Sequence, residues 1–214
     1  MPAEPGEQFW SEVFGRPGPV EIEIGPGCGT FLLHAARGNP AKNYVGIESS
    51  RSRATRLEAK VRRLELSNVI VLHAVAQCVI RDFVPPASVT AFHWYFPDPW
   101  WKRRHHRRRL FNEEFVRDLS RALLPGGRLF VATDVPLVAE AIRRACCACA
   151  ELRENHLQLP VRTVATRFER KARARGVPIY DFVFEKAAQC EAGGSPPLLS
   201  RTVSVTQTTT DAHS

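Results

Sequence analysis

The sequence lacks the features that would place it in a membrane, exported or metal-binding class. It has no apolar run of about 18 residues, so a transmembrane helix is not expected. Its first residues, MPAEPGEQFW, show no basic segment leading into an apolar one, so no secretory signal is predicted. The six cysteines include no repeated CxxC pair and no histidine at finger spacing. We therefore expect reduced thiols, no metal and a cytoplasmic protein.

Composition is otherwise that of a globular protein with an excess of basic residues. The 214 residues are 44% hydrophobic and 24% charged, so the chain can form one folded domain without disulfides. Three of the cysteines, Cys146, Cys147 and Cys149, fall in an alanine-rich helical stretch, where ordinary packing is favoured over a metal site. The net charge of +8 favours a polyanionic partner, although it also suits a generally basic proteome.

Strand patterns and helix patterns alternate along the chain. Strands are predicted at 20–24, 44–47, 69–72, 89–96, 128–133 and 179–185, and helices at 30–38, 52–66, 111–124 and 136–152. This alternation predicts an α/β fold with a doubly wound, mostly parallel sheet whose last strand is antiparallel. Residues 1–19 are predicted to be a loose arm, 20–186 the folded domain and 187–214 a disordered tail.

A glycine-rich loop joins the first predicted strand to the first helix. Gly25, Gly27 and Gly29 alternate with other residues, and Thr30 occupies the place of the third glycine of a dinucleotide fingerprint. Because Thr30 breaks the dinucleotide spacing, a dinucleotide dehydrogenase is the least favoured function, and no lysine stands where a phosphate-binding P-loop needs one. The GxGxG spacing resembles the first motif of Rossmann-like methyltransferases that use S-adenosylmethionine, although a bare turn would also need such glycines.

Two acidic residues flank this loop in the predicted fold. Glu23 lies just before it and suits a cofactor that carries a sulfonium and an ammonium but no phosphate. Glu48 closes the second strand, where a carboxylate can accept both hydroxyls of a ribose. The alternative is that both carboxylates are merely solvated. Loop and acids together favour an S-adenosylmethionine site.

The fourth predicted strand runs into an unusual segment, FPDPWWKRRHHRRR. Prolines on both sides of Asp98 present its carboxylate rigidly at a strand end. Trp100 and Trp101 offer flat surfaces for base stacking, and the basic run that follows suits phosphates. A solvated charged segment is the alternative, but the combination favours a nucleic-acid substrate.

This segment resembles the signature of the bacterial tRNA (guanine-N7-)-methyltransferases. The similarity extends over roughly residues 20–186 and includes EIGPGCG, GIE, LLPGGRLFVATD and the stretch TRFE followed by GVPIYDFVFEK. The resemblance implies a class I methyltransferase fold, S-adenosylmethionine as cofactor and a tRNA as partner. It also implies transfer of a methyl group to N7 of a guanosine, in the variable loop of the tRNA.

The resemblance assigns a role to each matching residue. Asp98 would be the catalytic acid and would also face the cofactor. The other cofactor-binding residues would be Glu23, Gly25, Gly27, Gly29 and Glu48. The substrate-binding residues would be Lys102, Asp134, Thr166, Arg167, Phe168 and Glu169. One departure concerns the adenine, because family members carry an acid after the third strand where this chain has Val75.

The sequence holds two further clusters of basic residues. Arg53, Arg56, Lys60 and Arg63 share one helical face, which we expect to be a solvated outer face. The basic residues within 162–175 adjoin TRFE and are expected to contact substrate.

A methyltransferase acting on another RNA, one acting on a small molecule and a catalytically inactive RNA-binding relative remain the alternatives. The basic aromatic segment argues against the small molecule. A monomer and a homodimer are both open.

Overall fold

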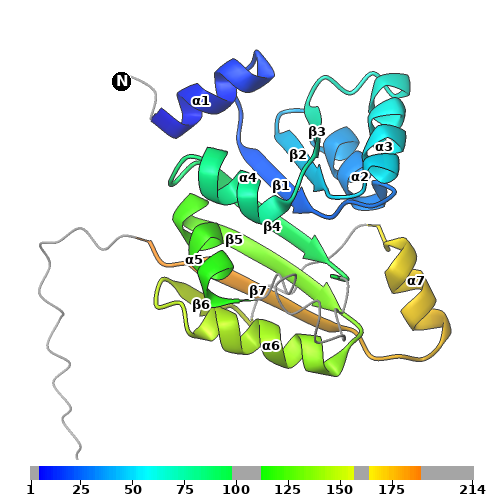
Figure 1. Ribbon diagram of the computed structural model, residues 1–214, viewed down its shortest axis with the longest axis vertical. Helices are drawn as coiled ribbons and strands as arrows, with labels where there is room; N and C mark the ends of the chain where they lie inside the picture. Colours follow the sequence, from blue (N-terminus) through cyan, green and yellow to red (C-terminus); the bar gives the residue numbers. More distant parts are fainter. Residues whose placement is uncertain (1–4, 98–111, 157–163, 189–214) are drawn as a thin grey trace, which may run out of the picture.

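The structure is a computed structural model, and it describes residues 5–97, 112–156 and 164–188. Within them, seven strands form one sheet in the order β3-β2-β1-β4-β5-β7-β6 (Figure 1). The first five strands are parallel to one another, β7 runs antiparallel to β5, and β6 runs antiparallel to β7. The strands are β1 (Val20–Ile24), β2 (Asn43–Glu48), β3 (Val69–His73), β4 (Val89–Tyr95), β5 (Leu123–Thr133), β6 (Leu152–Glu154) and β7 (Tyr180–Lys186). The predicted α/β fold is thus confirmed.

Helices cover both faces of the sheet. Side chains of α4, α5 and α6 pack with the apolar residues of β1, β4 and β5 in one core, and α2 and α3 pack in a second core against β2 and β3. The helices are α1 (Pro5–Phe14), α2 (Thr30–Gly38), α3 (Arg51–Arg63), α4 (Ala76–Phe83), α5 (Glu113–Ala122), α6 (Pro136–Cys147) and α7 (Arg167–Ala174). None of the described helices is both long and apolar enough to cross a membrane.

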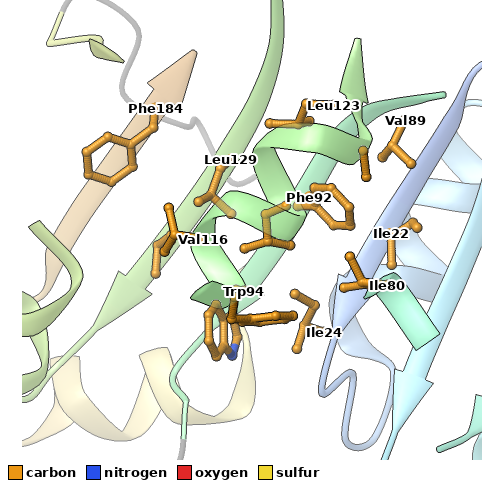
Figure 2. Close-up of a cluster of buried hydrophobic side chains, with 14 of the residues drawn as sticks. Ile22, Ile24, Ile80, Val89, Phe92, Trp94, Val116, Leu123, Leu129 and Phe184 are labelled. Atoms are coloured by element: carbon orange, nitrogen blue, oxygen red, sulfur yellow. The ribbon is translucent and has the colours of Figure 1, made fainter. Parts of the chain in front are cut away.

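The larger core lies between the sheet and α4, α5 and α6. Figure 2 shows Ile22 and Ile24 of β1 beside Phe92 and Trp94 of β4, with Ile80 of α4 packed over them. These side chains alternate along their strands, so their intervening neighbours point to the opposite face. On β1 those neighbours are acidic, and all five residues of the strand are buried. The sheet therefore carries acids beneath α2, on a covered face.

Four elements of the structure were not among the predicted ones. Helix α1 lies within the predicted loose arm, but Trp10 is only 6% exposed and packs in the larger core. Its ring also contacts Phe9 and Phe14 of the same helix. Helices α4 and α7 and the three-residue strand β6 were missed because each is short and depends on tertiary packing. Strand β5 begins at Leu123, before the Pro-Gly-Gly stretch expected to precede it. Residues beyond 188, most of the predicted tail, lie outside the described part.

Candidate active site

The glycine loop turns the chain sharply from β1 into α2. Gly25, Gly27 and Gly29 all have positive φ angles, of 68°, 56° and 78°. The loop is tied to β2 by a hydrogen bond of 2.9 Å from the amide of Gly25 to the carbonyl of Ile47. At Gly29 a Cβ atom would overlap a methyl group of Leu57, so glycine also permits α3 to approach.

Glu48, at the end of β2, holds this loop with its side chain. Its Oε2 accepts a hydrogen bond of 3.1 Å from the amide of Gly27, and its Oε1 accepts one of 2.8 Å from the amide of Ser50. Arg53 of α3 lies 3.0 Å from the same Oε1. The side chain of Glu48 is buried, so this carboxylate organises both the loop and the start of α3.

Glu23 lies on β1 just before the loop and is the least satisfied buried acid in the described residues. It is 4% exposed, and its Oε2 has no hydrogen-bond partner there. Burial, together with the negative charges of Cys28 and Glu48, raises the pKa of Glu23 to about 8. A cation placed beside this carboxylate would offset that cost.

Glu21, two residues earlier, shows the opposite behaviour on the same face of β1. Although burial opposes its ionisation, His93 and Lys42 outweigh that effect and lower the pKa of Glu21 to about 2. Its Oε1 accepts a hydrogen bond of 2.7 Å from Lys42, and its Oε2 accepts one of 2.9 Å from Nε2 of His93. Nδ1 of His93 lies 3.0 Å from the hydroxyl of Tyr95. This row of contacts includes Tyr95, which lines a cavity.

That cavity, of about 970 Å³, lies at the carboxyl ends of β1, β2 and β4. In open parallel sheets this is the usual place for a ligand. Its walls come from the glycine loop, α3, the start of α4, the end of β4 and α7. Seven of the predicted site residues line it, namely Glu23, Gly25, Gly27, Glu48, Thr166, Arg167 and Phe168.

The remaining predicted residues fall elsewhere. Gly29 lines a shallower neighbouring pocket, and Asp134 follows β5 without reaching either pocket. Glu169 is buried and accepts hydrogen bonds from Arg173, its neighbour one turn along α7. Asp98 and Lys102 lie outside the described residues, although Pro97, directly before Asp98, lines the cavity. Their roles stay predictions.

Helix α7 is fixed at the cavity by its own cap and by an aromatic contact. The hydroxyl of Thr166 accepts a hydrogen bond of 3.1 Å from the amide of Glu169, which caps the helix. Phe168 is 55% exposed, and its ring stacks on Phe96 with centroids 6.2 Å apart. Phe96 has a φ angle of 52°, a strained value for this residue, at the point where β4 turns into the cavity.

The basic face of α3 corrects one expectation. Arg53, Arg56 and Lys60 line the cavity, so the face expected to be solvated and outward is part of the site. Lys60 donates a hydrogen bond of 2.7 Å to the carbonyl of Cys28 in the glycine loop. Helical spacing grouped these cations correctly but could not show what they face. The position of α3 directly after Glu48, at a strand end, could have indicated that this face lies beside the site.

Val75 and the residues after it form the wall at the start of α4. Val75 is 49% exposed and lines the cavity together with Ala76 and Gln77. Its side chain offers no hydrogen-bonding group, as the sequence indicated. Gln77 brings an amide to the same wall, and an amide side chain can pair with the edge of an adenine.

Comparisons with known proteins place the chain among methyltransferases. The profile of a family described as putative methyltransferases matches residues 17–182. A tRNA (guanine-N(7)-)-methyltransferase of Burkholderia mallei is 32% identical over 189 residues, which cover 87% of this chain and 72% of the relative. One from Treponema pallidum strain Nichols is 37% identical over 181 residues, covering 80% and 68%. The chain belongs to the tRNA (guanine-N7-)-methyltransferase family.

Solved structures of other methyltransferases share the fold of this family member. TrmN from Thermus thermophilus superposes with a TM-score of 0.59 at 22% identity, over 85% of this chain and 48% of that one. The 16S rRNA methyltransferase KamB gives a TM-score of 0.61 at 17% identity, over 87% and 95%. At such identities the likeness establishes the Rossmann-like fold alone.

The cavity of this methyltransferase suits S-adenosylmethionine, its cofactor. The buried, unpartnered oxygen of Glu23 calls for a cationic group, which the ammonium of the cofactor supplies. The backbone at Gly25 and Gly27 leaves open space where a Cβ atom would stand. Glu48 borders the same space from the end of β2. These residues fit the cofactor on three counts.

Proposed function

We propose that this chain transfers a methyl group from S-adenosylmethionine to N7 of a guanosine in tRNA. The observation that carries the proposal is the cavity at the strand ends, whose floor holds two buried acids and whose mouth holds basic side chains. It occurs in a chain that covers about 70% of relatives named for this reaction. A tRNA partner in the cytoplasm follows from the same proposal. For the oligomeric state, a monomer and a homodimer both stay predictions.

The chemistry asks little of the protein beyond placement and charge. N7 of guanine bears an in-plane lone pair and no proton in the neutral base, so no general base, nucleophilic cysteine or metal is needed. The cofactor supplies an electrophilic methyl group on a sulfonium. Glu23 and Glu48 would hold its ammonium and ribose, and the glycine loop would allow the cofactor to lie close to the main chain. Rate enhancement would come from in-line placement and electrostatics.

Asp98 is proposed as the catalytic acid, against both cofactor and target base. The purine gains positive charge as the methyl group arrives, and a nearby carboxylate stabilises that charge. Asp98 or Asp134 can also accept the N1–H and N2–H of guanine, which adenine cannot offer in the same pattern. Phe168 and Arg167 would face the nucleotide from α7, together with Lys102 from the segment after Asp98 and with Thr166 and Glu169 at the helix start.

The test is to map the product. The purified chain is incubated with labelled S-adenosylmethionine and unmodified tRNA, and the RNA is then cleaved chemically at 7-methylguanosine. Cleavage at a single guanosine, with one methyl group per tRNA, is expected. Methyl transfer to a different atom, or binding of RNA without any transfer, would overturn the proposal.

A further inference from the structure

The mouth of the cavity is basic on two opposite sides. Arg56 and Lys60 line it from α3, and Arg167 and Lys171 line it from α7. We call these four residues the rim cations. All except the half-buried Lys60 are exposed, whereas the acids of the floor are buried. The cavity is therefore lined by buried acids in its interior and by basic side chains at its mouth.

The cofactor does not account for the rim cations. S-adenosylmethionine carries a sulfonium, an ammonium and a single carboxylate, and it has no phosphate. One carboxylate can offset one cation, and the sulfonium is repelled by the rest. Four basic side chains at the mouth therefore call for a polyanion that approaches from outside.

Two of the basic residues on the cavity side of α3 are engaged within the protein, and the one between them is not. Arg53 pairs with Glu48, and Lys60 donates to the carbonyl of Cys28. Arg56 makes no hydrogen bond or ion pair with another described residue. On α7, Lys171 is likewise exposed and makes neither kind of contact with a described residue. Arg56 and Lys171 are thus available on opposite walls.

An aromatic surface lies on the α7 side of the same mouth. Phe168 exposes 55% of its surface while its ring rests on Phe96. An exposed ring on the same helix as two cations of the cavity lining, Arg167 and Lys171, is an arrangement with which proteins bind single-stranded nucleic acid. Bases stack on the ring while the cations neutralise the phosphates around them.

We propose that the RNA strand carrying the target guanosine crosses the mouth of the cavity from α3 to α7, with Arg56 and Lys171 contacting its phosphates on the two sides. This inference rests on the proposed function and adds the path of the substrate. The target base then points down into the cavity toward the buried acids and the bound methyl donor. The strand must be unpaired there, because its base has to leave the stack to reach the floor.

The test measures the salt dependence of tRNA binding, in the absence of cofactor, for Arg56→Gln and Lys171→Gln. Each lost phosphate contact lowers the slope of log K against log salt by about 0.7–0.9, which weakens binding about fivefold near 0.1 M salt. The controls are Arg62→Gln on α3 and Arg144→Gln on α6, because both residues are exposed and neither lines the cavity. We expect the controls to retain the wild-type slope.

Two further variants make the result decisive. Arg56→Lys retains the charge and should restore the slope, which a purely structural effect of Arg56→Gln would not predict. In the double variant Arg56→Gln/Lys171→Gln, the change in slope from wild type should be about twice that in either single variant, since distant sites act additively. Equal losses in the controls, wild-type slopes in the rim variants, or a double variant no weaker than the singles would each overturn the proposal.

Failure of this inference is distinguishable from failure of the proposed function. If the wild-type chain forms 7-methylguanosine but Arg56→Gln binds tRNA like Arg62→Gln, the path is wrong and the reaction stands. If the rim variants lose slope as expected but no 7-methylguanosine forms, the path stands as an RNA-binding surface and the reaction is wrong.

Discussion

The guanidinium of Arg53 lies 3.0 Å from the carboxylate of Glu48. The acid expected to bind the ribose is therefore already paired with α3 and hydrogen-bonded to the glycine loop. Since the side chain of Arg53 is 49% exposed, the ion pair itself is worth little, about 0–1 kcal/mol. The two amide hydrogen bonds accepted by Glu48 matter more, because its carboxylate is buried and they hold the loop and the start of α3.

The two partners should therefore respond differently to substitution. Glu48→Ala is expected to weaken binding of S-adenosylhomocysteine at least tenfold and to destabilise the fold by about 1–3 kcal/mol, since it leaves two part-buried amides unpaired. Arg53→Ala should change both quantities by less than about threefold and 1 kcal/mol. Isothermal titration calorimetry and urea unfolding measure them. Equal losses of affinity in the two variants would contradict this assignment.

Glu23 should couple cofactor binding to proton release. Its pKa of about 8 leaves the carboxyl largely protonated at pH 7, and a cation bound beside it favours the charged form. Close to one proton should leave the protein as the cofactor binds at pH 7. Calorimetry in two buffers of different ionisation enthalpy measures that number. Glu23→Gln should abolish the release and weaken binding at least tenfold, and an unchanged release would refute the pairing.

Replacing Glu23 by an uncharged residue should stabilise the cofactor-free protein more at high pH than at low pH. The folded state holds the proton of Glu23 up to a pKa of about 8, whereas an ordinary carboxyl loses it near 4.5. Between these values the folded state binds more protons than the unfolded state, so stability falls as pH rises. Glu23→Gln should therefore raise the Tm of the cofactor-free protein at pH 8 more than at pH 5. A difference in Tm that does not vary with pH would count against this.

Gln77 and Val75 make the adenine side of the cavity testable. Gln77→Ala should weaken S-adenosylhomocysteine binding about tenfold if its amide pairs with the base, a loss typical of one hydrogen bond in a buried site. Val75→Asp should strengthen binding, because a carboxylate there can accept from the exocyclic amine. Both are read by titration with S-adenosylhomocysteine. If Val75→Asp weakens binding while Gln77→Ala has no effect, the adenine lies elsewhere.

Asp98 carries the proposed catalytic role. Asp98→Asn should lower kcat by about 10²-fold, a loss typical of removing one stabilising group, while the Tm stays unchanged. Single-turnover methylation, with saturating enzyme and cofactor in excess over tRNA, separates this loss from a change in binding. Wild-type kcat in the variant would remove Asp98 from the mechanism.

Much of the fold and part of the site could be predicted from the sequence. The acidic alternation in β1, the glycine spacing and Glu48 predicted residues that line the cavity, because strand ends and positive-φ turns depend on local residues. Helix α1 could not be predicted, since Trp10 is held by distant parts of the chain. That Arg56 and Lys60 face the cavity could not be predicted either. Helical spacing shows which residues share a face of the helix, but not what that face lies against. The hydrogen-bond partners of the buried acids are visible only in the packed structure. Glu21 contacts His93, whereas Oε2 of Glu23 has no partner among the described residues.

The order of the last three strands has a consequence for biosynthesis. Strand β7 lies between β5 and β6, and β6 pairs with no other described strand. As the chain is made, β6 emerges before the only neighbour it hydrogen-bonds to, and β5 keeps an open edge until residues 180–186 follow. The edge of β5 is therefore covered only once β7 has been made, and a chain that stops before residue 180 exposes that edge to pairing with other chains.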